Sequence, residues 1–125
     1  MDFEKVIRLF LMSNLTSFQQ LKTQFNIEGF AEKTIAQINK DLNGLSVGLI
    51  SDDNADDLLE NVSHQLIPII DELSKTSQLQ QFIYQVDLPE KQWLVFLNNQ
   101  DVIFLAHQII IREAQKVYLR EMFKP

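Results

Sequence analysis

The sequence predicts an all-α fold, a compact bundle of about five to seven helices around a central C-terminal helix. Apolar side chains recur at helical spacing along most of the chain. Glycine and proline, three of each in 125 residues, are too sparse to divide it into short elements. The stretch 102–123 is apolar over far more than one narrow stripe, which is typical of a central helix. No repeat or flexible linker interrupts the chain, so we expect a single domain over residues 1–125.

The N-terminal third should form three helices. Apolar residues at helical spacing predict the first over residues 3–13. A capping box at 16–19, in which a hydroxyl and a glutamine exchange hydrogen bonds with backbone N–H groups, opens a short second helix that ends near Asn26. The third is expected over residues 28–43, where an Asn-Gly pair is a typical C-terminal stop.

The stretch Leu45–Ser51 alternates weakly between apolar and polar residues and is the one segment whose pattern suits a strand. The chain offers it no obvious partner strand, and an isolated strand is not stable by itself. We therefore expect an ordered apolar loop packed on the core. The alternative is edge pairing across a dimer.

A long helix should follow from about Asn54 to Lys75, capped within Asp52–Asn54. Its apolar residues fill one side, namely Ala55, Leu58, Leu59, Val62, Leu66, Ile69, Ile70 and Leu73. Its charged residues and His64 fill the other. Pro68 lies on the polar side, where the carbonyl that it leaves unpaired can turn to water, so we expect a bend rather than a break.

Two short helices and one long helix complete the predicted bundle. Ser77 to Gln80 reads as a capping box and opens a helix with an apolar face up to Val86. Residues 87–90 should end that helix and start the next, with Asp87 as its cap. That helix is expected to end at Asn98-Asn99, and Asp101 should cap the last one.

Charge is unevenly distributed along the chain, whose net charge is −6. Residues 51–90 carry nine acidic side chains against Lys75 alone, while residues 91–125 are mildly basic. Nucleic acid is a poor partner for such a chain, because binding to phosphates needs clustered positive charge. The absence of cysteine excludes disulfides and thiolate metal sites and fits a cytoplasmic location. The sequence shows neither a secretory signal nor a membrane-spanning apolar run.

A basic stripe is the first candidate site, because lysine or arginine recurs at every fourth residue near the C-terminus. Its members are Arg112, Lys116, Arg120 and Lys124. The stripe can pair with the acidic face of the 54–75 helix, in the same chain or in a partner, and such exposed pairs contribute only about 0–1 kcal/mol each. Alternatively it binds an anionic partner.

For both histidines the sequence favours a structural role over a functional one. His107 lies in the apolar arc of the last helix and is expected to be a buried or half-buried core histidine. His64 shares a helix face with Glu60, and the two side chains together could bind a divalent cation. Two residues of one helix nevertheless supply too few ligands for a metal site. The spacing of acids from Asp52 to Asp57 suggests a calcium loop, yet glycine and the bidentate glutamate are missing from the positions that need them.

Aromatic residues gather in sequence around the two short helices, namely Phe82, Tyr84, Trp93, Phe96 and Phe104. We expect them to belong to the core. If some are exposed, the segment Leu79–Leu97 becomes the preferred recognition surface, because exposed aromatic patches mark interfaces.

These observations favour a non-enzymatic helical protein-interaction or scaffolding domain, with a homodimer as one form of it. The segregated charge and abundant apolar residues point to a protein partner or self-association, and to neither nucleic acid nor a membrane. The alternative is a small-molecule binder with an apolar cavity between helices, suggested by nine phenylalanines. No spacing indicates a nucleophile–base pair, a metal site or a phosphate loop, so we expect no catalytic activity and no cofactor.

Overall fold

The computed structural model describes residues 29–51 and 57–122. These residues form five helices and no strand: α3 (Phe30–Leu42), α4 (Leu58–Ser74), α5 (Gln78–Val86), α6 (Glu90–Asn99) and α7 (Val102–Met122). The predicted all-α bundle is thereby confirmed. The two helices expected before residue 28 and the basic residue Lys124 lie outside the described residues.

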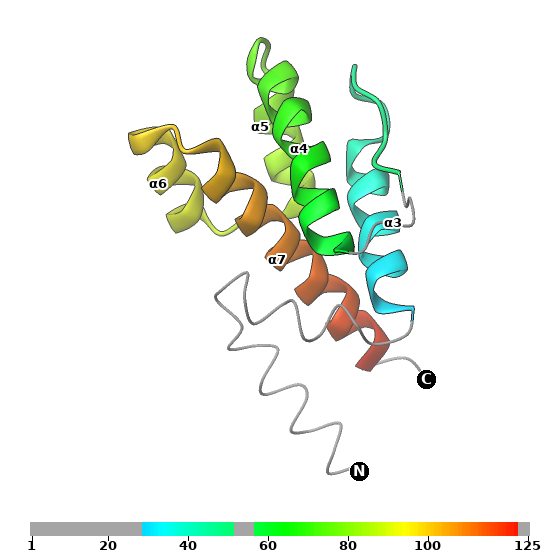
Figure 1. Cartoon of the computed structure of the whole chain (residues 1–125). Coiled ribbons are helices and arrows are strands. Elements are labelled where there is room, and N and C mark those ends of the chain that lie inside the picture. Colours follow the sequence, from blue (N-terminus) through cyan, green and yellow to red (C-terminus); the bar gives the residue numbers. More distant parts are fainter. Residues whose placement is uncertain (1–28, 52–56, 123–125) are drawn as a thin grey trace.

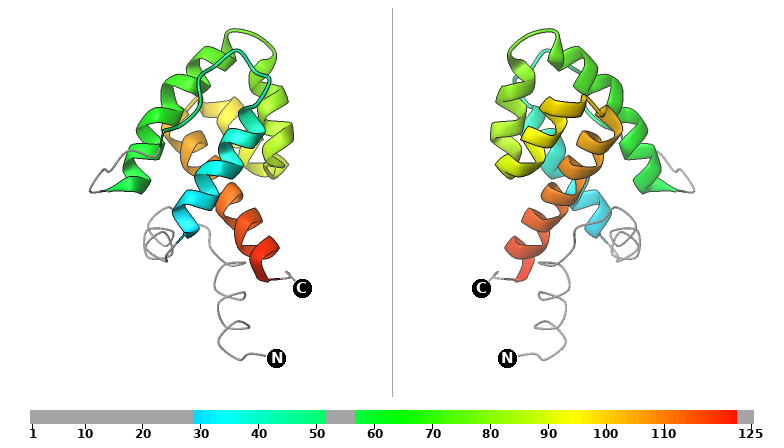
Figure 2. Two further views of the ribbon diagram at one scale, coloured as in Figure 1. Left: turned by 90° about the vertical axis from the view of Figure 1, so that its right-hand side faces the viewer. Right: turned by 90° about the vertical axis from the view of Figure 1, so that its left-hand side faces the viewer.

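Helix α7 is central, as the sequence predicts. It contacts each of the other four described helices, and in Figure 1 it runs diagonally through the bundle. Its fully buried side chains occupy several sides of the helix and include Leu105, Ala106, Ile109, Ile110, Ala114 and Val117. The side views in Figure 2 show α3 crossing the C-terminal half of α7, while α4, α5 and α6 surround its N-terminal half.

Helix α4 packs the predicted apolar face inward and begins later than expected. Leu59, Val62, Leu66, Ile70 and Leu73 are buried along it. Asp57 is its N-cap, and the Asp57 carboxylate accepts a hydrogen bond of 3.1 Å from the Glu60 N–H. The prediction that Asp52–Asn54 caps this helix is therefore wrong. The helix continues through Pro68, which lies on the exposed side.

The stretch 45–51 is an ordered loop, as expected, and side-chain amides take the place of a partner strand. The Asn39 side chain pairs with both backbone groups of Ile50, at 2.8 and 3.0 Å, and Ile50 is buried. Gln65 pairs in the same way with both backbone groups of Ser51, at 2.8 and 2.9 Å. These bonds satisfy backbone groups that a neighbouring strand would otherwise have to pair.

The junctions of the short helices differ from the predicted caps. Ser77 precedes α5 but its side chain makes no capping hydrogen bond, so the predicted capping box is absent. Asp87 does not cap α6, because it adopts a left-handed conformation (φ 62°) that ends α5, and Pro89 occupies the N-cap of α6. Asp101 does cap α7, accepting a 3.0 Å hydrogen bond from the Phe104 N–H.

Candidate functional site

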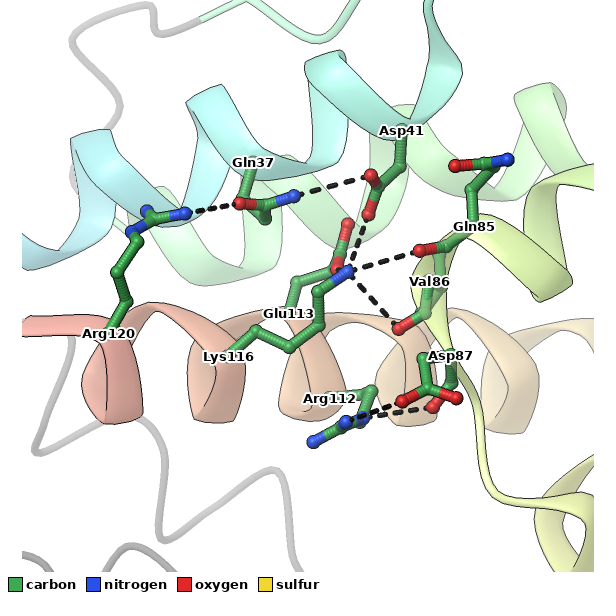
Figure 3. A network of polar contacts seen from close by, with 9 residues as sticks. All are labelled: Gln37, Asp41, Gln85, Val86, Asp87, Arg112, Glu113, Lys116 and Arg120. Carbon is green, nitrogen blue, oxygen red and sulfur yellow. Dashed lines mark hydrogen bonds and ion pairs between the residues drawn. The ribbon is translucent and has the colours of Figure 1, made fainter.

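The three described residues of the basic stripe, Arg112, Lys116 and Arg120, contact α3 and the C-terminal end of α5. Arg112 donates two hydrogen bonds of 2.9 Å to Asp87, one to its carbonyl and one to its carboxylate. Arg120 donates a 2.7 Å hydrogen bond to the Gln37 side chain (Figure 3). The predicted intrachain pairing with the acids of α4 is wrong for these residues. Arg112 and Arg120 contact α5 and α3 instead.

Lys116 is the most enclosed of the three stripe residues that the structure describes. Its ammonium group lies 2.8 Å from both Asp41 Oδ2 and Glu113 Oε1, and 3.2 Å from the carbonyl oxygens of Gln85 and Val86. The two carbonyls belong to the last turn of α5, where helical carbonyls lack partners within the helix. Lys116 therefore stabilises the C-terminus of α5 while it joins α7 to α3 (Figure 3).

Glu113 is buried completely, although it is a charged residue type in the middle of the core. The Lys116 ammonium lies 2.8 Å from Glu113 Oε1, but neither carboxylate oxygen has a partner at hydrogen-bond geometry among the described residues. Burial raises the pKa of the Glu113 carboxyl from 4.5 to about 9, with the adjacent Asp41 carboxyl acting in the same direction and the Lys116 ammonium opposing it. At neutral pH the Glu113 carboxyl is therefore protonated.

Lys116 keeps its charge in this environment. Burial by itself would lower the pKa of the Lys116 ammonium, but the hydrogen bonds and negative charges of Asp41 and Glu113 outweigh it and raise that pKa. Because Glu113 is protonated at neutral pH, Asp41 is the carboxylate that pairs with Lys116 there. We call the set Gln37, Asp41, Glu113, Lys116 and Arg120 the α3–α7 polar seam.

The polar seam is structural in its chemistry, because Gln37, Asp41, Lys116 and Arg120 are joined by hydrogen bonds to one another. Gln37 donates a 3.2 Å hydrogen bond to Asp41 while it accepts the one from Arg120. Sequence reasoning missed Gln37, Asp41 and Glu113. The available signal was Glu113 itself, an acid that helical spacing places within the apolar arc of the last helix.

The histidines and the acidic residues near them do not form a metal-binding site within the described residues. The His64 side chain is 75% exposed and lies 4.0 Å from Glu60. His107 is half-buried, and burial lowers the pKa of its imidazole against the smaller opposing effects of Glu60 and Asp101. No group of three metal-ligating side chains occurs within residues 29–51 and 57–122. The acids at 52–56 lie outside the described residues.

Helix α6 differs from the other described helices, because it buries only Phe96. Leu94 and Leu97 on α6 remain 53% and 47% exposed, and Ile103 in the first turn of α7 is 56% exposed. Trp93 is half-buried and stacks on Phe96 with ring centroids 5.6 Å apart. In Figure 1 α6 lies at the edge of the bundle beside the start of α7. The helix thus presents leucines to solvent next to a tryptophan.

A groove of about 350 Å³ separates α6 from the turn between α4 and α5. Its lining carries no charged side chain and consists of Ser74, Thr76, Ser77, Leu79, Gln80, Trp93, Phe96, Leu97 and Gln100. Trp93, Leu94, Leu97 and this groove together form what we call the α6 surface. It falls mostly within the aromatic segment 79–97. Of the predicted core aromatics, Phe82 and Phe96 are buried, whereas Tyr84 is 81% exposed on α5.

No protein-family model, curated protein or solved structure matches this chain. None of the five described helices combines the length and the apolar composition of a membrane span. The functional argument therefore rests on the chemistry of the two regions described above.

Proposed function

We propose that this protein is a non-enzymatic helical protein-interaction domain whose α6 surface receives an apolar helix of a partner protein. One observation carries the proposal. Helix α6 buries a single side chain while it exposes Leu94 and Leu97 beside an uncharged groove. Apolar side chains grouped next to a groove with an aromatic wall are typical of helix-recognition sites.

The energetic argument concerns the two leucines. Fully burying a leucine side chain contributes about 1.5–3 kcal/mol relative to leaving it exposed, and neither side chain realises this in the single chain. Leu94 and Leu97 are three residues apart, so they lie on one side of α6 and form a ridge. A second helix with leucine-sized side chains can pack against that ridge and fill the groove.

The basic stripe is the other predicted partner site, and the proposal gives it a lesser role. Arg112, Lys116 and Arg120 already contact Asp87, Asp41 and Gln37 within the chain. An anionic partner would have to compete with these contacts. Binding through the stripe stays a prediction, and its fourth member, Lys124, lies outside the described residues.

Site-specific photocrosslinking in cells that make the protein tests the proposal. Benzoylphenylalanine placed at Leu94 is expected to form a covalent adduct with a protein, and Leu97→Glu in the same chain is expected to abolish that adduct. The matched control carries the crosslinker at Tyr84, which is also exposed but lies on α5. No adduct at Leu94 above the level at Tyr84 would contradict the proposal.

A small molecule is the second candidate occupant, favoured by the groove beside Trp93. The groove differs from the predicted apolar cavity, because serine, threonine and glutamine side chains form much of its lining. Trp93 is the only tryptophan of the chain, so its fluorescence reports on occupancy directly. Saturable quenching by an uncharged aromatic compound, without loss of the Leu94 adduct, would favour this function. A cytoplasmic location is part of the proposal and rests on the absence of cysteine.

A further inference from the structure

We infer that Asn43, in the turn that ends α3, is a site of spontaneous covalent modification, at which the side-chain amide is lost and an aspartate or an isoaspartate forms. The reaction is intramolecular, and water is its only co-reactant. Three features of Asn43 and Gly44 support it: their order in the sequence, their exposure, and the freedom of the reacting groups from hydrogen bonds.

The order of the two residues favours the reaction. It begins when the backbone nitrogen of the residue after an asparagine attacks the side-chain carbonyl carbon and closes a five-membered ring. A side chain on that next residue hinders the approach, and glycine has none. Asn43 is the only asparagine of the chain that is followed by glycine.

The turn leaves both reacting groups accessible. Asn43 and Gly44 are exposed, and within the described part of the chain neither the Asn43 side chain nor the Gly44 N–H makes a hydrogen bond. Ring closure needs a rotation about the Cα–C bond of Asn43, whose ψ is 131°. Gly44 can compensate for this rotation, because it has no side chain and open space surrounds its Cα.

The other described asparagines are held more firmly. Asn39 and Asn61 lie inside α3 and α4, where helical hydrogen bonds hold the backbone nitrogen of the next residue. Their side chains are also occupied, that of Asn39 by the loop backbone and that of Asn61 by Gln65 at 2.6 Å. Asn98 lies inside α6, and the Asn99 side chain accepts a backbone hydrogen bond of 2.9 Å. Asn43 should therefore react before them.

The bond changes balance without any reagent other than water. The Gly44 nitrogen gives up its proton and bonds to Cγ of Asn43, while the Cγ–Nδ2 bond breaks and the side-chain nitrogen leaves as ammonia. Water then opens the ring. Attack at Cγ gives aspartate, whereas attack at the backbone carbonyl leaves the main chain running through Cγ and gives isoaspartate. Because the attacking nitrogen must lose its proton, the rate rises with pH.

Both products carry a new carboxylate at position 43, in the lining of a polar pocket of about 320 Å³ at the end of α3. Lys40, Asp41, Gln81 and Gln85 line the same pocket. Asp41 also belongs to the polar seam, and the net charge of −6 becomes one unit more negative. The chain thus has an original form and an older, more acidic form that differ beside the polar seam.

Incubation of the folded full chain at neutral and mildly alkaline pH, followed by peptide mapping with mass spectrometry, tests the inference. Position 43 should change from an amide to an acid, faster at the higher pH, and electron-transfer fragmentation should show both aspartate and isoaspartate. The described asparagines in helices, Asn39, Asn61, Asn98 and Asn99, are internal controls and should stay intact over the same period.

Asn43→Gln is the matched variant, because it keeps the amide but would have to close a larger and less favourable ring. It should stay intact, and circular dichroism establishes that it is folded. An Asn43 that stays intact in the folded chain would overturn the inference, and conversion in the urea-unfolded chain alone would show that the turn protects it. Earlier conversion of a control asparagine would also overturn it. So would aspartate without isoaspartate, since direct hydrolysis of the amide gives aspartate alone.

Discussion

The α3–α7 polar seam and the α6 surface are opposites in composition and in completeness. The seam places a buried acid, a lysine and an aspartate in the interior, and its polar groups lie within contact distance of partners from the same chain. The α6 surface places leucines and a tryptophan at the exterior, where the described chain covers them only in part. A polar cluster with internal partners indicates architecture, whereas an apolar surface without cover indicates an interaction.

The contrast requires that Lys116 stabilises the fold. Lys116→Met tests this requirement and should cause the largest loss of stability of the variants proposed. The substitution keeps most of the side-chain stem but leaves Asp41 and the carbonyls of Gln85 and Val86 without their cation. Removing one partner of a buried pair costs about 3–5 kcal/mol. Urea unfolding should show this loss. The control Lys40→Met changes an exposed lysine on α3 and should alter stability by less than about 0.5 kcal/mol.

Glu113 makes stability depend on pH in a defined direction. The unfolded chain releases this proton near the ordinary pKa of 4.5, whereas the folded chain holds it up to a pKa of about 9. The contribution of Glu113 to stability is therefore fully present below the lower value and is lost as pH rises through the higher one. The slope between them is at most about 1.4 kcal/mol per pH unit.

Glu113→Gln should remove that slope and make the protein more stable than wild type near pH 9. Urea unfolding at several pH values, compared between the two proteins, measures the difference. A wild-type slope equal to that of the variant would show that Glu113 ionises normally, and the polar seam would then contain a second buried negative charge.

The Arg112 side chain is less buried than the polar seam and less exposed than the α6 leucines. We therefore expect its substitution to have an intermediate effect on stability. Its side chain is 23% exposed, and it holds the left-handed Asp87 that ends α5. Arg112→Met keeps the apolar stem and should cost about 0.5–1.5 kcal/mol, the net contribution of hydrogen bonds of this kind. Adding 1 M salt should not reproduce the loss fully, because the bond to the Asp87 carbonyl is not an ion pair. A stability change within error would mark the contact as dispensable.

Helical spacing predicted the fold because it is a local property that survives tertiary packing. The apolar arc of residues 102–123 correctly indicated the central helix, and the lack of a partner strand correctly indicated the loop at 45–51. Caps were harder to predict. Asp87 suits an N-cap by residue type, but its carboxylate pairs with Arg112, which lies 25 residues away in the sequence.

The sequence predicted less of the polar seam than of the α6 surface, again because a sequence shows only local patterns. The polar seam joins Lys116 to Asp41 across 75 residues of sequence, and no local pattern specifies such a pair. The stripe containing Lys116 was visible, but its intrachain partners were not. The segment containing α6 was predicted as a recognition surface on the condition that its aromatics are exposed. In the structure Tyr84 of α5 is exposed, while on α6 the leucines Leu94 and Leu97 are more exposed than the aromatic residues.

The smallest expected effect belongs to Leu94→Ala and tests the other half of the contrast. Leu94 is about half exposed, so its truncation removes little packing from the single chain, and stability at low protein concentration should fall by less than about 0.5 kcal/mol. The buried neighbour Phe96 is the control, since Phe96→Ala should cost about 3–5 kcal/mol. A loss above about 1.5 kcal/mol for Leu94→Ala in dilute monomer would mean that the chain itself covers this leucine. The α6 surface would then be part of the core, as the polar seam is, and would not be available to a partner.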